Sequence, residues 1–195
     1  MTGRATGPHL HWGVQWGRRR IDPALLVKGA PFIPLGKRIE VSVREQKLYF
    51  YQGKKLLKEY PVSTAARGVG NRSGSNRTPL GLHKISHKIG QDAPRGTVFV
   101  GRVDTGRIAE IYTEPINLPD DAITSRILRL EGLEPGVNKG GNIDTFSRYI
   151  YIHGTQEEGL IGSPASKGCV RMKNDDLIEL FELVEAGTPV YISSE

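Results

Sequence analysis

Cys169 is the only cysteine among the 195 residues, and His153 precedes it by sixteen positions. A lone thiol becomes a good nucleophile only when its pKa falls or when a neighbouring base takes its proton, and a histidine can do both. The alternative is a buried structural thiol, because a free cysteine also behaves as a small apolar residue. Lys167 and Gly168 suit an exposed turn better than a core, so the local sequence favours a reactive cysteine.

The segments around both residues resemble the L,D-transpeptidase (YkuD-type) catalytic domain, a family of bacterial cysteine acyltransferases of peptidoglycan. The resemblance rests on His153-Gly154-Thr155, followed at this spacing by Ser166-Lys167-Gly168-Cys169-Val170-Arg171-Met172. Segments 39–43, 47–51, 60–64, 78–81 and 161–165 occur in family order and support it. The resemblance covers roughly residues 37–192, so we interpret residues 37–195 as the catalytic domain and residues 1–36 as an N-terminal arm and linker.

The resemblance implies acyl transfer with Cys169 as the nucleophile and His153 as the general acid and base. The thiolate would attack the bond between an L-centre and a terminal D-alanine in a tetrapeptide stem, leaving a thioester. The family's acceptor is the side-chain amine of a diamino acid in a neighbouring stem. Water as the acceptor would make the protein a carboxypeptidase, and this alternative stays open. No metal or other cofactor is implied.

Two glycines of the motif have expected backbone roles. The carbonyl of Gly154 would orient the imidazole, as a main-chain group does in the family. The backbone N–H groups around Gly168 and Cys169 are candidates for the oxyanion hole, where the loss of one donor typically costs about 3–4 kcal/mol.

Three further motif residues are candidate substrate-binding residues. Arg171 would either bind a stem-peptide carboxylate or pair with an acid of the fold, since its planar guanidinium suits both roles. Ser166 would either contact the substrate or form hydrogen bonds within the turn. Lys167 stands where many family members carry histidine, and its charge would favour a neighbouring thiolate.

The remaining pattern predicts a mostly β, YkuD-like sandwich or meander of short strands with one helix. The 24 glycines and 12 prolines make up about 18% of the chain, above the usual value of roughly 12%. Strands are expected at 39–43, 48–51, 56–62, 82–88, 97–102, 107–112, 126–130, 148–153 and 189–193. The run from Tyr149 to Ile152 would deliver His153 to the end of its strand. Segment 65–77 is a long loop, either functional or a plain surface excursion.

One helix is expected over about 174–186, directly after the nucleophile. Asn174 is the predicted N-cap, and Asp175 and Asp176 suit the positive end of the helix dipole. Gly187 and Pro189 would end it. Its packing would hold the Cys169 turn in place.

The first 36 residues resemble the C-terminal end of lysostaphin-type zinc endopeptidases, on His9-Leu10-His11 and Arg20-Ile21-Asp22-Pro23. A catalytic zinc needs at least three protein ligands, and that family's other ligands lie upstream of this segment. We therefore expect a strand-prone remnant, from a broken fusion or a late start of the chain, without a working zinc site.

Composition excludes several classes of protein. The net charge of +6 comes from scattered basic residues apart from Arg18-Arg19-Arg20, which suits an anionic cell envelope better than nucleic acid. No stretch of about 18 apolar residues predicts a membrane span, and no secretory signal is visible. The family implies peptidoglycan stem peptides as partners and the cell envelope as location. A non-catalytic wall-binding module is the competing hypothesis, but it would have no need of a thiol and imidazole pair.

Overall fold

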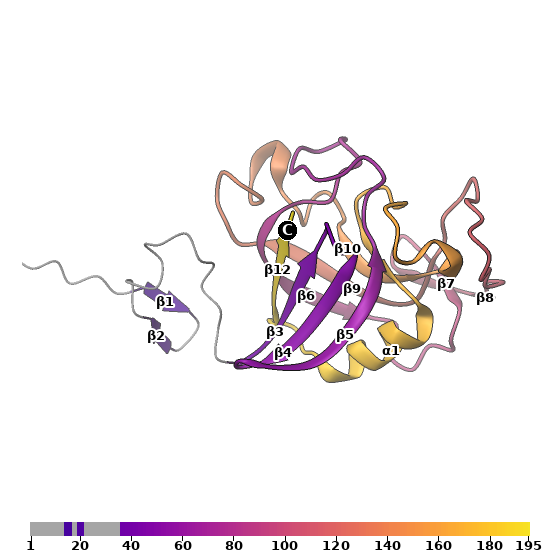
Figure 1. The fold of residues 1–195 in the computed structure, drawn as a ribbon, viewed down its shortest axis with the longest axis horizontal. Helices are drawn as coiled ribbons and strands as arrows, with labels where there is room; N and C mark the ends of the chain where they lie inside the picture. The colour runs from indigo at the N-terminus through magenta and orange to yellow at the C-terminus, as the bar shows by residue number, and fades with distance from the viewer. Residues whose placement is uncertain (1–13, 17–18, 22–35) are drawn as a thin grey trace, which may run out of the picture. The chain divides into compact units, whose positions relative to one another are not determined.

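The computed structural model describes residues 14–16, 19–21 and 36–195 (Figure 1). In the first of two units, β1 (Val14–Trp16) pairs antiparallel with β2 (Arg19–Ile21), with Val14 opposite Ile21. The segment expected to be strand-prone thus contains two short strands. His9 and His11 lie outside the described residues, so the expectation of no working zinc site stays a prediction.

The second unit holds ten strands and one α-helix. The strands are β3 (Lys37–Ser42), β4 (Lys47–Gln52), β5 (Lys55–Ser63), β6 (Gly81–Ile89), β7 (Thr97–Val100), β8 (Val103–Ile108), β9 (Ile123–Gly132), β10 (Tyr151–Thr155), β11 (Val170–Met172) and β12 (Pro189–Ser193). The helix is α1 (Asn174–Leu183), and the 3₁₀ turns η2 (Gly141–Ile143) and η3 (Glu158–Leu160) flank β10 in the chain. The prediction of a mostly β domain with one helix is confirmed.

All ten strands belong to one sheet, in the order β10-β11-β5-β4-β3-β12-β6-β9-β7-β8. Because β9 also pairs with β10, eight of these strands form a closed circuit, and β7 and β8 extend it as a hairpin (Figure 1). Most pairs are antiparallel, but β10 runs parallel to β11 and β12 runs parallel to β3. The circuit brings the strand of His153 beside the segment that carries Cys169.

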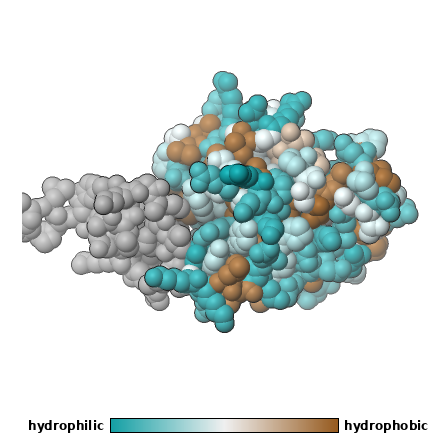
Figure 2. All heavy atoms as spheres, in the orientation of Figure 1, coloured by the Kyte–Doolittle hydropathy of each residue, from teal (hydrophilic) through white to brown (hydrophobic). Residues whose placement is uncertain are grey.

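The main core lies inside this circuit. Strands β3 and β12 show why: Ile39 and Val41 alternate with polar residues and are buried, as are Val190 and Ile192 opposite them. The helix α1 buries Leu177, Leu180 and Phe181 in the same cluster and contacts β9 and β10. Burial of each such side chain contributes about 1.5–3 kcal/mol. Hydrophilic residues cover most of the face shown in Figure 2, with apolar residues in separate patches.

The structure corrects three expectations about elements near the site. The strand expected at 148–153 begins only at Tyr151, because Tyr149 has a positive φ of 55° and lies in the preceding turn, so His153 is in mid-strand. Asn174 is the first helical residue, and the N-cap is Lys173. The helix ends at Leu183 rather than near residue 186. The short strand β11 was not predicted.

No helix of the described residues is long and apolar enough to cross a membrane.

Candidate active site

The parallel pair of β10 and β11 brings Cys169 and His153 to one face of the sheet. Ile152 is opposite Val170, and both side chains are buried in the main core. Because side chains alternate along strands, the flanking residues Cys169 and His153 project from the other face. Cys169 directly precedes β11, so its side chain lies where that face begins.

A tight turn presents Cys169 to this face. The Ser166 hydroxyl donates a hydrogen bond to the Cys169 carbonyl at 2.6 Å and accepts one from the Gly168 N–H at 3.2 Å. Gly168 has φ +127°, and a Cβ there would lie 3.3 Å from the Arg77 carbonyl oxygen. Only glycine tolerates this conformation without strain. Ser166 is buried within the turn, which favours the turn-shaping alternative for its role.

The long loop 65–77 packs against the same turn. Ala66 donates a backbone hydrogen bond to Ser166 at 3.0 Å. The half-buried guanidinium of Arg148 holds the loop by donating to the carbonyls of Gly70 at 3.2 Å, Asn71 at 2.9 Å and Arg77 at 2.6 Å. The loop is therefore a wall beside Cys169.

The thiol of Cys169 is held by backbone groups at the start of β10. Its sulfur lies 3.6 Å from the Tyr149 carbonyl oxygen, which accepts the S–H, and 3.4 Å from the donating Tyr151 N–H. Burial raises the pKa of Cys169 to about 11, against the lowering effect of the Tyr151 N–H and of the cations Arg148 and Arg171. Cys169 is therefore a neutral thiol in this structure. Its activation requires a base to take the proton.

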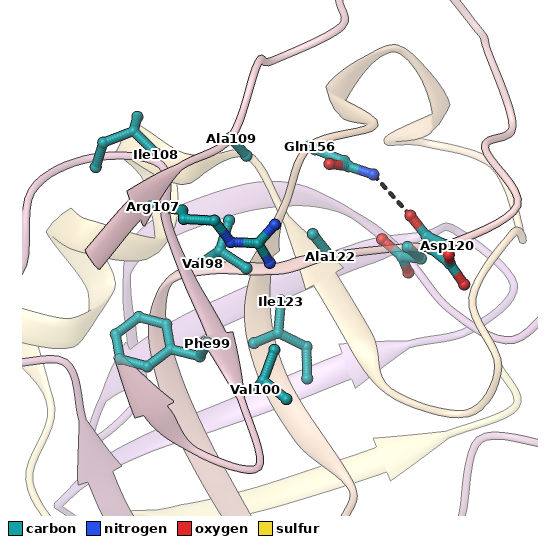
Figure 3. Close-up of a pocket in the computed structure, with 11 residues that line it drawn as sticks. Val98, Phe99, Val100, Arg107, Ile108, Ala109, Asp120, Ala122, Ile123 and Gln156 are labelled. Atoms are coloured by element: carbon teal, nitrogen blue, oxygen red, sulfur yellow. Dashed lines mark hydrogen bonds between the residues drawn. The ribbon is translucent and has the colours of Figure 1, made fainter. Parts of the chain in front are cut away.

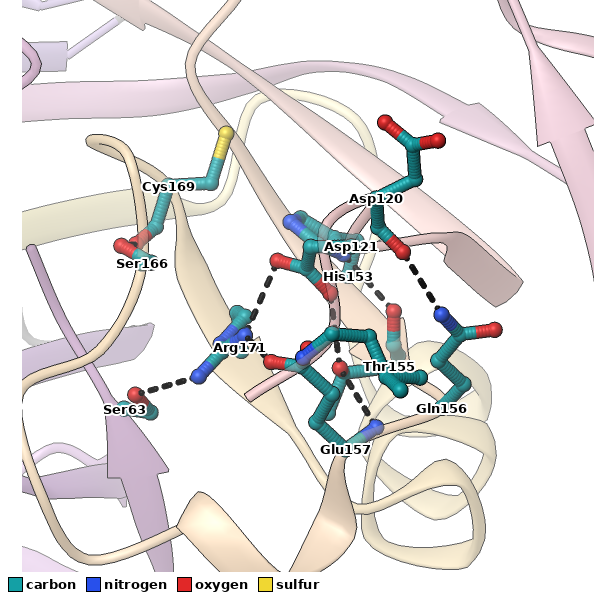
Figure 4. Close-up of polar contacts among 12 residues, drawn as sticks. Ser63, Asp120, Asp121, His153, Thr155, Gln156, Glu157, Ser166, Cys169 and Arg171 are labelled. Carbon is teal, nitrogen blue, oxygen red and sulfur yellow. Dashed lines mark hydrogen bonds and ion pairs between the residues drawn. The ribbon is translucent and has the colours of Figure 1, made fainter. Parts of the chain in front are cut away.

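His153 has the tautomer and the neutral charge that such a base needs. Its Nδ1 lies 2.7 Å from the Gly154 carbonyl oxygen, so an Nδ1–H donor leaves Nε2 as an acceptor (Figure 4). Burial lowers the pKa of His153, while Asp121 and the Gly154 carbonyl raise it. The imidazole is therefore neutral near pH 7. Gly154 itself must lack a side chain, because a Cβ would lie 2.6 Å from both Asn174 Oδ1 and the Thr124 carbonyl oxygen.

Arg171 lies at the centre of a buried ion network (Figure 4). Its Nη1 lies 2.6 Å from Glu157 Oε2 and 3.0 Å from Asp121 Oδ2, and its Nη2 donates to Ser63 Oγ at 3.2 Å. The Arg171 side chain is 0% exposed. This arrangement favours the alternative in which Arg171 pairs with acids of the fold, and it takes the guanidinium away from a substrate carboxylate. Lys167, by contrast, is exposed.

The sequence analysis missed Asp121, Glu157 and Arg148. Glu157 lies just beyond the end of β10, at the N-cap of η3, and no strand period predicts its contact with Arg171. Asp121 comes from the segment before β9, and its Oδ1 accepts a hydrogen bond from Thr155 Oγ1 at 2.9 Å. No local pattern predicts that contact, because β9 and β10 meet only in the folded sheet.

The arrangement supports nucleophilic acyl transfer: a thiol, a neutral imidazole oriented through Nδ1, and a turn rich in backbone N–H groups. The Gly168 N–H is directed at Ser166, so the Cys169 N–H is the other oxyanion candidate in this turn. Within residues 14–16, 19–21 and 36–195, no group of three His, Cys, Asp or Glu side chains is arranged to hold a metal ion.

A family model described as the L,D-transpeptidase catalytic domain matches residues 36–192. A putative L,D-transpeptidase YkuD of Bacillus licheniformis is 48% identical over 188 residues, covering 95% of this chain and 81% of that protein. A probable L,D-transpeptidase YcfS of Escherichia coli is 28% identical over 156 residues, covering 79% of this chain. The chain spans only 43% of the length of that relative.

Solved structures have a similar fold. L,D-transpeptidase 3 from Mycobacterium tuberculosis, in complex with a faropenem-derived adduct, has a TM-score of 0.50 at 15% identity, covering 81% of this chain and 60% of that chain. At this identity the likeness concerns the fold alone.

Proposed function

The chain belongs to the family of L,D-transpeptidase catalytic domains, and from this premise we propose that it cross-links peptidoglycan stem peptides by cysteine acyl transfer. The observation that carries the proposal is the shared face of Cys169 and the Nδ1-anchored His153. The site of action is the cell envelope, where the polymer lies.

In the first half-reaction, His153 Nε2 takes the Cys169 proton as sulfur attacks the carbonyl carbon that precedes the terminal D-alanine. The C–S bond forms and the C–N bond breaks. The imidazolium returns the proton to the leaving amine, so that D-alanine departs and a thioester remains. Because burial raises the Cys169 pKa and lowers that of His153, the resting pair is neutral and the proton moves during the attack.

In the second half-reaction, an amine replaces D-alanine at the thioester. His153 removes a proton from the attacking amine and returns it to sulfur, which restores the thiol. The Cys169 N–H is the donor proposed for the oxyanion in both halves. Arg171 is not assigned to the substrate. Its pairing with Glu157 and Asp121 supports a role in holding β11 against β10.

Incubation with purified tetrapeptide muropeptides tests this function. Intact-mass spectrometry should detect the acyl-enzyme, and product analysis should detect cross-linked dimers. Trimmed tripeptides alone would identify a carboxypeptidase instead. Cys169→Ser should abolish acyl-enzyme formation with an unchanged circular dichroism spectrum, because a hydroxyl is far harder to deprotonate than a thiol. Wild-type turnover by this variant would refute Cys169 as the nucleophile.

A carbapenem provides an independent probe of the same thiol. The wild-type protein should gain the mass of one opened carbapenem ring, and His153→Ala should slow this acylation by about a hundredfold or more, the usual contribution of a general base. The matched control is His87→Ala, which changes an exposed histidine of β6. An equal rate for His153→Ala and wild type would contradict the role of His153.

A further inference from the structure

Figure 3 shows a pocket that the mechanism above does not use. Its volume is about 510 Å³, and it lies between the β7–β8 hairpin and the segment Asp120–Ile123. Val98, Val100, Ile108 and Ala122 supply much of its apolar wall. The pocket therefore has the size and apolar lining of a small-ligand site.

The pocket shares two walls with the Cys169 site. A second apolar cluster consists of Phe99, Ile127 and Tyr151, with Ile123 and Cys169 packed against it, and Phe99 and Ile123 also line the pocket. On the polar side, Asp121 lines the pocket and pairs with Arg171. Through Phe99 and Ile123, the apolar cluster that packs against Cys169 therefore also lines the pocket.

The strand order indicates which part of the substrate would reach the pocket. Cys169 directly precedes β11, His153 is on β10, and the pocket is lined from β9, β7 and β8. Since β10 lies between β11 and β9, the pocket lies on the side of His153 away from the sulfur. His153 handles the amine in both half-reactions, so the group bonded to the amine nitrogen faces the pocket.

The charges in the pocket fit a ligand that carries both an ammonium and a carboxylate. Arg107 projects its guanidinium into the pocket between Val98 and Ala122 (Figure 3), and no ion pair of Arg107 is formed within the described residues. Arg107 is an exposed residue of β8, and a guanidinium binds a carboxylate through two parallel hydrogen bonds. Asp120 and Asp121 supply negative charge for an ammonium.

We propose that this pocket binds an α-amino carboxylate: first the D-amino acid that leaves, then the amine that replaces it, with Arg107 holding the carboxylate. The inference rests on the acyl-transfer function proposed above. The leaving amine is released from the carbonyl carbon that the incoming amine later attacks. Both amines therefore occupy the same place beside this carbon, and one subsite serves both.

The test offers the acyl-enzyme two amines of the same shape. The full chain is incubated with a tetrapeptide stem and with either deuterated D-alanine or D-alaninamide, and mass spectrometry counts the exchanged product. Wild type should prefer D-alanine. Arg107→Met should lower the ratio of the D-alanine rate to the D-alaninamide rate about tenfold, the effect of roughly 1.4 kcal/mol. Arg107→Lys should retain part of the preference.

The control is Arg44→Met, which changes an exposed arginine in the turn between β3 and β4 and should keep the wild-type ratio. An acyl-enzyme that forms normally, with an unchanged ratio in Arg107→Met, overturns the pocket proposal and leaves the function standing. Failure of wild type to form an acyl-enzyme or any exchanged product overturns both.

Discussion

At the scale of single residues, burial shifts the pKa values of Cys169 and His153 in opposite directions. Burial makes both the Cys169 thiolate and the His153 imidazolium costly, so each residue is neutral at rest. Asp121 raises the pKa of both groups, because its negative charge disfavours the thiolate and favours the imidazolium. In the proposed mechanism, Asp121 is therefore a positioning residue, whose charge would affect the reaction without touching the reacting atoms.

Asp121→Asn should move the acid limb of kcat/KM to lower pH. The active form needs neutral His153, so activity falls when pH drops below the pKa of this residue. Burial already keeps that pKa below its ordinary value, and loss of the Asp121 charge lowers it further. The measurement is the pH profile of acyl-enzyme formation from the donor stem, with the His153 pKa followed by NMR.

The matched control for this change is Glu110→Gln, an exposed acid outside the ion network, which should keep the wild-type profile. If the acid limb of Asp121→Asn stayed in place or moved upward, the electrostatic role of Asp121 would be wrong.

At the scale of elements, Asn174 fastens α1 to the strands of the site. Its side-chain nitrogen donates to the Thr155 carbonyl at 2.9 Å and to Glu158 Oε1 at 2.6 Å. Its Oδ1 accepts from Thr124 Oγ1 and Ser125 Oγ, both at 2.6 Å. The same Glu158 oxygen accepts a hydrogen bond from the Asn174 backbone N–H at 2.8 Å. This carboxylate therefore pairs one of the N–H groups in the first turn of the helix that have no partner within the helix.

Asn174→Ala should lower the free energy of unfolding by about 2–4 kcal/mol, because it leaves the buried hydroxyls of Thr124 and Ser125 without their acceptor. Urea unfolding followed by circular dichroism measures the change. Asp175→Asn, at the exposed neighbouring position, should change the stability by less than about 0.5 kcal/mol. Equal stability of the two variants would show that the Asn174 contacts do not hold the helix.

At the scale of the whole molecule, a buried histidine on β6 couples stability to pH. His83 is 0% exposed. Its Nδ1 lies 2.9 Å from the Gly81 carbonyl oxygen, and its Nε2 lies 3.2 Å from Thr145 Oγ1, which suits the neutral ring. Burial lowers the pKa of His83 to about 4. The unfolded chain therefore binds a proton at a higher pH than the folded one does.

The native state should consequently lose about 3 kcal/mol of stability through His83 as pH falls from about 6.5 to about 4. The contribution of neutral His83 to stability is fully present above the pKa of this residue in the unfolded chain and declines as the pH falls below it. His83→Gln, which cannot be protonated, should give a shallower decline in urea-unfolding free energy over this range. The control His87→Gln, an exposed position on the same strand, should retain the wild-type slope. Identical slopes in all three proteins would contradict the assignment.

The N-terminal arm gives a second prediction at this scale. The residues that the described structure brings to the site lie between Ser63 and Asn174, so deletion of residues 1–36 should leave acyl-enzyme formation within a few-fold of the full chain. The arm should also carry no stoichiometric zinc, because the resemblance to zinc endopeptidases supplies only His9 and His11, and a catalytic zinc needs at least three protein ligands. Tightly held zinc in the purified protein, or lost activity on deletion, would show that the arm is functional.

The sequence by itself determined the family and most of the elements. The proposed roles of the thiol, the histidine and the glycines rest on two local motifs, and the alternation of Ile39 and Val41 or the apolar face of α1 is readable residue by residue. The strands expected at 39–43, 48–51, 56–62 and 189–193 were confirmed for the same reason, since period and turn residues are local properties. The strand expected at 107–112 was wrong, because β8 is Val103–Ile108, the exposed second strand of a hairpin, which has no buried apolar alternation to reveal it.

Only the tertiary structure decided how the site is assembled. The burial of Arg171 between Glu157 and Asp121, the neutral resting thiol and the wall formed by loop 65–77 depend on which strands meet. The start of β10 also depended on the tertiary structure. Tyr149 adopts a left-handed backbone conformation, in which its carbonyl oxygen contacts Cys169, and the hydrophobic run of the sequence does not reveal this conformation. Side-chain pKa values and ion pairs follow from burial and from partners far apart in the chain, and neither is a property of a local sequence pattern.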